Sequence, residues 1–303
     1  MSKRILLFPG QGSQYLGMGK AVADAHAPSK KLLDQASEIL GFDLSDLLWN
    51  APEDRLTQTQ NTQPALFVVS CMALEWVKHK GISFDFVAGH SLGEYSALYA
   101  ANALTFEAGL KLVRKRGELM ASAGEKMPGA MAAVLGLEKE KLTEVLQQAN
   151  QSGLVVAANF NSLTQIVISG SAAGVEAAIL LCESAGAKKV VRLPVSGAFH
   201  SPLMNFAVSG LRESLAQVQF THPNVPVITN VEAEPQSNEK RFADLLLQQM
   251  TSPVRWVESM QKAQSLGVTE ALEVGTGKVL MGLLRGITRD IKVMPVEGPA
   301  DLP

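Results

Sequence analysis

The chain has 303 residues, of which 47% are hydrophobic and 18% are charged. This length and apolar content suit one large domain, or one with a smaller companion, and exclude an intrinsically disordered chain. The net charge is −2 and basic residues are not gathered in one block. This charge pattern disfavours a nucleic-acid-binding surface but is compatible with a local anion pocket.

The N-terminal segment predicts a first strand rather than a targeting signal. Its short apolar run ends at Pro9-Gly10, which is too early for a signal peptide. No stretch approaches the roughly 18 consecutive apolar residues of a membrane span, so we expect a cytoplasmic protein. The two cysteines, Cys71 and Cys182, lie in apolar helical patterns without metal-ligand neighbours. They predict buried thiols and no metal site.

A glycine-rich loop follows the strand predicted over residues 4–8. Open α/β sheets bind ligands at the carboxyl ends of their strands, where this loop lies. Its spacing matches neither a phosphate-binding loop nor a dinucleotide fingerprint. The candidate residue is Gln11, which is either a hydrogen-bond donor to a ligand or an ordinary solvated glutamine. Helices are predicted next over residues 29–40 and 63–79.

The strand predicted over residues 84–88 runs directly into Gly89-His-Ser-Leu-Gly93, and a helix is predicted over residues 92–101. A sharp strand-to-helix turn needs small residues two before and two after the serine, and it exposes the hydroxyl. The pattern therefore predicts a nucleophile elbow at Ser91, with the Leu92 amide free to donate to an oxyanion. The alternative is an ordinary turn with a capping serine.

The helix predicted over residues 105–123 carries one charged side chain on its apolar face. At about 100° per residue, its apolar residues form one arc and most of its charges lie opposite. Arg116 falls inside the apolar arc, where an unpaired guanidinium is very costly. The pattern predicts a carboxylate partner for Arg116, supplied by a ligand or by the protein, unless the side chain snorkels to the surface.

Between residues 129 and 192 the elements shorten and follow the order β-α-β-β-α-β, which is that of a ferredoxin-like unit. We predict a small domain of residues 127–196 inserted into a catalytic domain of residues 1–126 and 197–303. Asn159 and Asn161 follow a predicted strand end and either line the cleft or form a turn. The predicted strands cover 130–135, 154–158, 165–169 and 188–193, and the helices cover 139–149 and 172–185.

One histidine stands in a setting typical of a catalytic base. His200 follows an apolar run in a loop of small residues, and Ser201-Pro202 can start the next helix. His90 lies inside the elbow, as a hydrogen-bonding neighbour of the serine or as a packing residue. Beyond these, strands are predicted over 225–230 and 270–274, helices over 243–250 and from 252, and a second glycine loop at 275–277 leads into a helix.

A serine hydroxyl needs an adjacent base, and His200 is the candidate. In α/β-hydrolases an aspartate or glutamate lies between the serine and the histidine in the chain. No aspartate lies between Ser91 and His200, and the glutamates there fall in or next to predicted helices. A dyad whose histidine is oriented by a neutral acceptor, such as a main-chain carbonyl, therefore fits better than a triad.

Several motifs together resemble those of the malonyl-CoA:acyl carrier protein transacylase family, in that family's order and over nearly the full length. They are Phe8-Pro-Gly-Gln-Gly-Ser-Gln14, Gly89-His-Ser-Leu-Gly-Glu-Tyr-Ser-Ala-Leu98, Arg116-Gly117, Gly197-Ala-Phe-His-Ser-Pro-Leu-Met204 and Gly275-Thr-Gly-Lys-Val-Leu280. The resemblance implies a stand-alone enzyme with an α/β-hydrolase-like core, a mostly parallel sheet and a ferredoxin-like insert. Thr276 departs from the family, which often has proline there.

The resemblance also implies a role for each matching residue. Ser91 would be the acylated nucleophile and His200 the base. Gln11 and the amide of Leu92 would form the oxyanion hole. The main-chain carbonyl of Gln249 would orient His200, which supplies the neutral acceptor expected above.

The choice of acyl group and a ping-pong mechanism follow from the same resemblance. Arg116 would pair with the malonyl carboxylate, while Phe199 and Leu92 would crowd an α-methyl group. Malonyl-CoA would acylate Ser91, and the phosphopantetheine thiol of holo acyl carrier protein would then take the malonyl group for fatty acid or polyketide synthesis. These steps need no metal or redox cofactor.

Two other functions compete with this interpretation. A serine hydrolase, either a thioesterase or an esterase, could use the same elbow, although the embedded Arg116 and the missing triad acid count against it. A non-catalytic module that binds a carrier protein would keep the fold without being acylated at Ser91.

Overall fold

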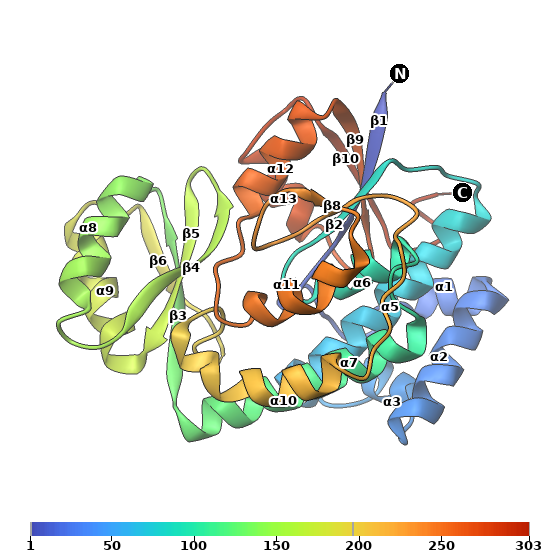
Figure 1. Ribbon diagram of the computed structural model, residues 1–303, viewed down its shortest axis with the longest axis horizontal. Coiled ribbons are helices and arrows are strands. Elements are labelled where there is room, and N and C mark those ends of the chain that lie inside the picture. Colours follow the sequence, from blue (N-terminus) through green and yellow to red (C-terminus); the bar gives the residue numbers. More distant parts are fainter. Residues whose placement is uncertain (1, 196, 303) are drawn as a thin grey trace.

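The computed structural model describes residues 2–195 and 197–302, which form an α/β fold with two sheets (Figure 1). The larger sheet has the strand order β10-β9-β1-β2-β7-β8 and is parallel except for β8, which pairs antiparallel with β7. It is therefore a mixed sheet. Its strands are β1 (Lys3–Phe8), β2 (Phe86–Gly89), β7 (Val227–Ile228), β8 (Pro235–Gln236), β9 (Val268–Val274) and β10 (Lys292–Val296).

Helices cover both faces of this sheet because its central strands are apolar on both sides. In β1, Leu6 and Phe8 join one buried cluster, whereas Ile5 and Leu7 join another on the opposite face. The first face packs against α1 (Lys20–Ala25), α2 (Ala27–Leu40), α3 (Leu44–Trp49), α4 (Glu53–Thr57), α5 (Thr59–His79), α6 (Gly93–Ala100), α7 (Phe106–Lys126), α10 (Asn205–Leu215) and α11 (Phe242–Gln249). The second packs against α12 (Trp256–Ser265) and α13 (Val279–Arg285).

The smaller sheet, at the left of Figure 1, has the order β4-β5-β3-β6 with all neighbours antiparallel. Alternate residues of β3 again divide between two cores. Ala132 and Val134 pack under the two helices of this unit, and Met131 and Ala133 join the large cluster. The elements are β3 (Gly129–Leu135), α8 (Lys139–Ala149), β4 (Val155–Ser162), β5 (Gln165–Ser171), α9 (Ala172–Ser184) and β6 (Lys189–Arg192).

Two predicted strands have different lengths in the structure. The strand predicted to end at residue 158 continues to Ser162, because residues 159–162 still pair with β5. The main chain of Val254 also bonds this strand on both sides of Asn159, at 2.8 and 2.9 Å. The strand predicted over 225–230 covers only Val227–Ile228. After that point the chain turns, since Thr229 and Ala233 bond each other rather than the sheet.

The helix predicted over residues 63–79 begins earlier, at Thr59. Pro64, expected in its first turn, therefore lies in the second turn, where it cannot donate to the Gln60 carbonyl. That carbonyl instead accepts from Arg114 Nη1 at 2.9 Å, which explains why the helix tolerates the proline. The short helices α1, α3 and α4 and the strands β8 and β10 were not predicted.

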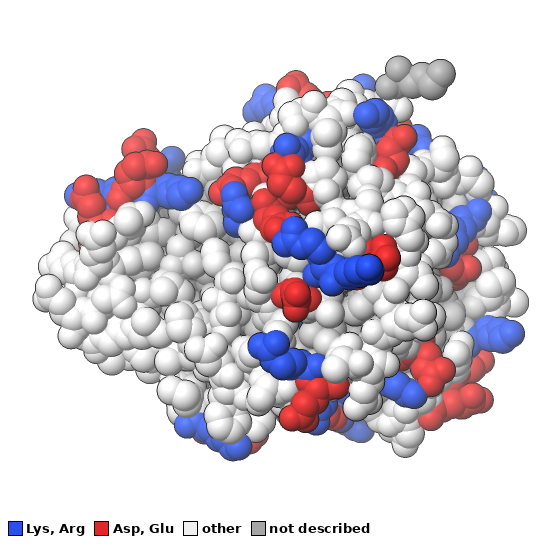
Figure 2. Space-filling view, viewed as in Figure 1, with Lys and Arg blue, Asp and Glu red and all other residues white. Residues whose placement is uncertain are grey.

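The surface carries charges of both signs. On the face shown in Figure 2, basic and acidic side chains lie interspersed rather than gathered by sign. Several form ion pairs, such as Arg241–Glu232 at 2.7 Å. Among the described residues, no helix is long and apolar enough to cross a membrane, and no cluster of three or more potential ligands suits a metal ion.

Candidate active site

A tight turn joins β2 to α6 and holds Ser91 with a φ of 52°, in the left-handed region. The two glycines of the pattern permit this close approach. A Cβ at Gly89 would lie 1.9 Å from the Gly93 carbonyl carbon, and one at Gly93 would lie 2.0 Å from the Phe8 oxygen. Such contacts are impossible for any other residue, so the glycine spacing is a steric requirement of this turn.

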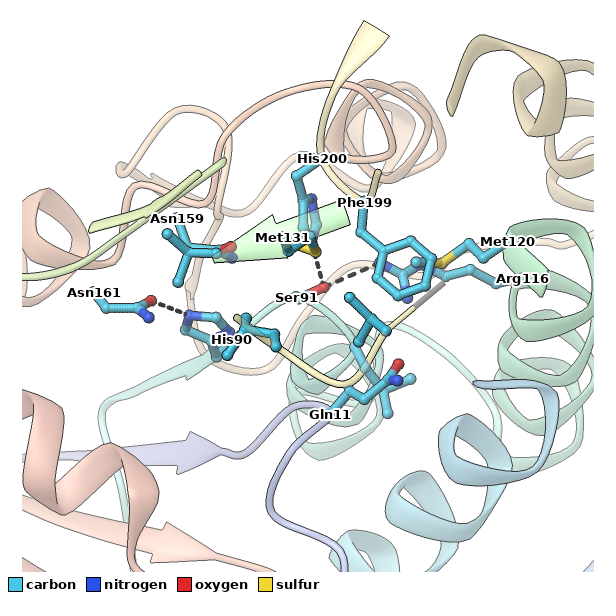
Figure 3. A pocket seen from close by; sticks show the side chains of 14 residues that line it. Gln11, His90, Ser91, Arg116, Met120, Met131, Asn159, Asn161, Phe199 and His200 are labelled. Atoms are coloured by element: carbon cyan, nitrogen blue, oxygen red, sulfur yellow. Dashed lines mark hydrogen bonds between the residues drawn. The ribbon is translucent and has the colours of Figure 1, made fainter. Parts of the chain in front are cut away.

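His200 meets Ser91 from a distant part of the chain. Its Nε2 lies 2.7 Å from Ser91 Oγ (Figure 3). Its Nδ1 lies 2.8 Å from the main-chain oxygen of Gln249. A carbonyl oxygen only accepts, so Nδ1 carries the proton and Nε2 accepts from the serine hydroxyl. The residue that follows, Ser201, caps the short helix Pro202–Met204 by accepting from Leu203 N–H at 3.3 Å.

Arg116 reaches the same point from α7 and is only 1% exposed. Its Nη2 donates to Ser91 Oγ at 3.1 Å and to Gln249 Oε1 at 3.0 Å, and its Nη1 donates to Gln63 Oε1 at 2.8 Å. All three acceptors are uncharged, and the buried Nε has no partner among the described residues. The side chain is therefore neither snorkelling nor paired with a protein carboxylate in the described chain.

Two residues beside Ser91 in the cavity wall can offer main-chain N–H groups. Gln11 and Leu92 both line the cavity, and neither N–H has an acceptor within residues 2–195 and 197–302. The side-chain amide of Gln11 is already engaged, since it donates to Thr59 Oγ1 at 3.2 Å. The main-chain N–H groups, rather than that side chain, are thus the donors without an acceptor in the described residues.

These side chains open into a cavity of about 140 Å³ between the two sheets (Figure 3). His90 lies in its wall and holds Asn161 through a contact of 2.8 Å between Nε2 and Oδ1. Asn159 lies beside them, within β4 rather than beyond a strand end. The rest of the wall is largely apolar, formed by Leu92, Met120, Met131, Val167, Leu193, Val195 and Phe199.

Comparison with known proteins agrees with this geometry. Residues 5–295 match the acyl transferase domain family. A malonyl CoA-acyl carrier protein transacylase of Bacillus subtilis (strain 168) is 46% identical over 300 residues, covering 99% of this chain and 95% of that protein. The chain belongs to the malonyl-CoA:acyl carrier protein transacylase family.

Two solved structures of transacylases show the same fold. The crystal structure of an acyl carrier protein S-malonyltransferase from Vibrio cholerae has a TM-score of 0.95 at 41% identity, with 99% of both chains covered. A malonyl-transacylase in complex with its type II PKS acyl-carrier protein has a TM-score of 0.96 at 37% identity, covering 99% of this chain and 98% of that one.

In this member of the transacylase family, both cavity histidines are uncharged at neutral pH. Burial, and then the neighbouring Arg116 charge, lower the pKa of His200 to about 3. Burial also lowers the pKa of His90. An uncharged His200 ring keeps Nε2 free to accept a proton, as a general base must.

Sequence reasoning missed three side chains that hold this transacylase site together. Gln63 supports Arg116, while Glu94 and Asn230 lie beneath the elbow. A glutamate within the otherwise apolar helix of the elbow was a visible signal for Glu94, because such a position is buried. No local sequence pattern indicated Asn230, since its place beneath the elbow depends on the turn that follows β7.

Proposed function

We propose that this protein transfers the malonyl group of malonyl-CoA to the phosphopantetheine thiol of an acyl carrier protein through a malonyl-Ser91 intermediate. The observation that carries the proposal is the buried Arg116 guanidinium, which donates to Ser91 Oγ at 3.1 Å and has only neutral partners. Such a group favours an acyl chain that ends in a carboxylate. One relative described above is a malonyl-transacylase in complex with a type II PKS acyl-carrier protein. We infer that this chain likewise serves a carrier protein, in fatty acid or polyketide synthesis.

In the first half-reaction, Ser91 Oγ attacks the thioester carbonyl carbon and its proton passes to His200 Nε2. The oxyanion accepts from the main-chain N–H groups of Gln11 and Leu92, which are worth about 3 kcal/mol each in such sites. The carbon–sulfur bond then breaks, and His200 returns the proton to the coenzyme A thiolate. The product is malonyl-Ser91.

In the second half-reaction, the carrier thiol gives its proton to His200 Nε2 and attacks the acyl carbon. The same two N–H groups stabilise the second oxyanion. The bond to Ser91 Oγ then breaks, and the proton returns from His200 to the serine. The enzyme is thereby restored, and the malonyl group leaves on the carrier as a thioester.

In this proposal, binding of the acyl carboxylate also raises the pKa of His200. The Arg116 charge is one of the causes that lower the pKa of His200. A malonyl carboxylate paired with Arg116 would offset that charge, so the His200 ring would become more basic when the correct acyl group is bound. Phe199 and Leu92, both buried in the cavity wall, would crowd an α-methyl group and favour malonyl.

A serine hydrolase on the same elbow remains the alternative to test. Malonyl-CoA and holo acyl carrier protein are mixed with the enzyme, and malonyl-carrier protein and free malonate are quantified. Transfer far above hydrolysis supports the proposal, and free malonate as the main product supports the hydrolase. An intact-mass gain of one malonyl group, lost in Ser91→Ala, excludes a module that only binds the carrier.

The proposal extends to the domain organisation. We infer an α/β-hydrolase-like catalytic domain of residues 1–126 and 197–303 and a ferredoxin-like small domain of residues 127–196. The β-α-β-β-α-β order of residues 129–192 and their separate antiparallel sheet support the division. Residues 1, 196 and 303 lie outside the described residues. The cytoplasmic location expected from the sequence stays a prediction.

A further inference from the structure

A buried carboxylate that the mechanism above does not use lies beneath the elbow. Glu94, in the first turn of α6, is only 1% exposed. Its Oε2 accepts from Gln249 Nε2 at 2.8 Å and from the main-chain N–H of Asn230 at 3.1 Å. Both donors are neutral amides, and a carboxylate held only by neutral donors is costly to bury. The burial of this acidic side chain without a cation in hydrogen-bond contact among the described residues points to a role beyond stability alone.

Asn230 connects this carboxylate to the nucleophile. With its own N–H held by Glu94, its side chain contacts both sides of the elbow. Oδ1 accepts from the Ser91 N–H at 2.7 Å, and Nδ2 donates to the Gly89 oxygen at 2.6 Å. Ser91 has a φ of 52°, a conformation that persists only where the surroundings impose it. Asn230 supplies that constraint.

Gln249 connects the same carboxylate to Arg116. Because Glu94 Oε2 accepts from this amide, Gln249 must turn Nε2 toward it, and Oε1 then faces Arg116 Nη2 at 3.0 Å. The same Nε2 donates to the main-chain oxygen of Ser91 at 3.0 Å. One carboxylate thus determines which way the amide points and, through it, where the guanidinium is held.

We infer that Glu94 is a positioning residue for acyl transfer, acting on the nucleophile through Asn230 and on the acyl-carboxylate site through the Gln249 side chain. This inference rests on the proposed function. It predicts that one substitution, remote from the reacting atoms, changes both the rate of serine acylation and the preference for malonyl over acetyl groups. A residue that serves only stability would change neither in the folded enzyme.

The test measures acylation of Ser91 by malonyl-CoA and by acetyl-CoA in single-turnover intact-mass experiments, each normalised to the acylatable fraction of the full-length enzyme. Glu94→Ala should lower the malonyl rate by roughly 10- to 100-fold, the effect of a small misplacement of reacting groups, and should lower the malonyl-to-acetyl ratio. Glu94→Gln keeps a carbonyl oxygen for both hydrogen bonds and should recover most of the loss.

A matched control is a second buried glutamate outside the cavity. Glu273 accepts from the main-chain N–H groups of Leu280 and Met281 at 2.8 and 2.7 Å. Glu273→Ala should lower the melting temperature and leave the normalised acylation rates and their ratio unchanged. Asn230→Ala separates the two connections, because it should slow acylation by both thioesters without changing their ratio.

Each outcome bears on the inference. Folded Glu94→Ala with wild-type rate and ratio overturns it, and a slower rate with an unchanged ratio overturns the connection through Gln249. If Glu94→Ala does not fold, two other variants test the inference. It is overturned if Asn230→Ala acylates at the wild-type rate, or if Glu94→Gln accepts acetyl groups as readily as malonyl groups. A wild-type enzyme that malonyl-CoA does not acylate contradicts the proposed function instead, and the acetyl-CoA rates then still test Glu94.

Discussion

In the proposed function, Arg116 is the residue that distinguishes this site from that of a general serine esterase. Its guanidinium is buried among the neutral oxygens of Gln63, Gln249 and Ser91. Burial lowers the pKa of Arg116 below its usual value, although an arginine remains charged. The folded protein therefore carries the desolvation cost of a cation without a protein counter-charge in contact, and a bound carboxylate would offset part of that cost.

We expect Arg116→Ala to shift acyl preference from malonyl toward groups without a carboxylate. Removing one partner of a buried charge pair costs about 2–5 kcal/mol, so kcat/KM for malonyl-CoA should fall about 30-fold or more relative to acetyl-CoA. Steady-state kinetics with both thioesters measure the change. Lys111→Ala, an exposed position on the same helix, is the control. A variant with wild-type malonyl preference would show that Arg116 does not bind the carboxylate.

His200 makes stability depend on pH. Its pKa is lowered from 6.5 to about 3 in the folded protein, so the unfolded chain binds the proton first as pH falls. The stability it contributes is complete above pH 6.5 and is lost toward pH 3, at about 1.4 kcal/mol per pH unit. Glu94 has the opposite effect on the pH dependence of stability. Burial raises its pKa to about 7, so its contribution to the free energy of unfolding declines as pH rises from 4.5 to 7.

The two effects can be separated by a variant. We expect His200→Gln to lose less stability than the wild type between pH 6.5 and pH 4, because it has no imidazole to protonate on unfolding. Urea unfolding at a series of pH values measures this difference. Parallel pH profiles for the two proteins would contradict the lowered pKa of His200.

At the scale of elements, the position of Ser91 depends on how closely β2, α6 and β1 approach one another. The strand ends at Gly89, the helix begins at Gly93, and Gly93 touches the Phe8 oxygen of the neighbouring strand. Only three residues separate β2 from α6, so neither element can shift without moving Ser91. The same proximity places Gln11 and Leu92 in the wall of one cavity.

We predict that Gly89→Ala abolishes acylation and destabilises the protein by about 3 kcal/mol or more, because the added Cβ would overlap the Gly93 backbone. Thermal unfolding and intact-mass acylation measure the two effects. The control is Gly282→Ala in α13, where a Cβ meets nothing within 4 Å. That change should be neutral or stabilising by up to about 1 kcal/mol. A Gly89→Ala enzyme that acylates normally would show that the turn is not as tight as described.

At the scale of the whole molecule, the cavity exists only because the two sheets meet. Serine, histidine and arginine come from the larger unit, whereas Asn159, Asn161, Met131 and Val167 come from the smaller sheet. The main chain of Val254 bonds β4 on both sides of Asn159 and joins the two parts. His90 and Asn161 add a side-chain link across the same boundary at 2.8 Å.

We expect the contributions of His90 and Asn161 to the free energy of unfolding to be coupled. Asn161→Ala should lower the free energy of unfolding by about 0.5–1.5 kcal/mol, because it removes the hydrogen bond to the half-buried His90 ring. A double-mutant cycle with His90→Ala, followed by urea unfolding, should give an interaction energy of about 0.5–3 kcal/mol. Simple additivity of the two changes would mean that the contact does not hold the sheets together.

Much of the site could be predicted because its parts are marked locally. The glycines around Ser91, the small residues before His200 and the apolar arc around Arg116 each express a steric or electrostatic demand within a few residues of chain. Strand lengths were less predictable. Residues 159–162 stay in β4 because they still pair with β5, and Val254, remote in sequence, bonds the main chain on both sides of Asn159. The chain leaves the larger sheet at Thr229, which places Asn230 under the elbow.

The sequence alone predicted Ser91, His200 and Arg116 as site residues and the kind of local structure in which each lies, because backbone sterics and hydrophobic periodicity act over short stretches. Tertiary structure alone decided that three side chains 25 to 109 residues apart meet around one hydroxyl. It also decided that Arg116 has only neutral partners there, and that Glu94 orients the amide holding it. The physical reason is that hydrogen bonds and burial depend on distance in space, which local sequence patterns do not encode.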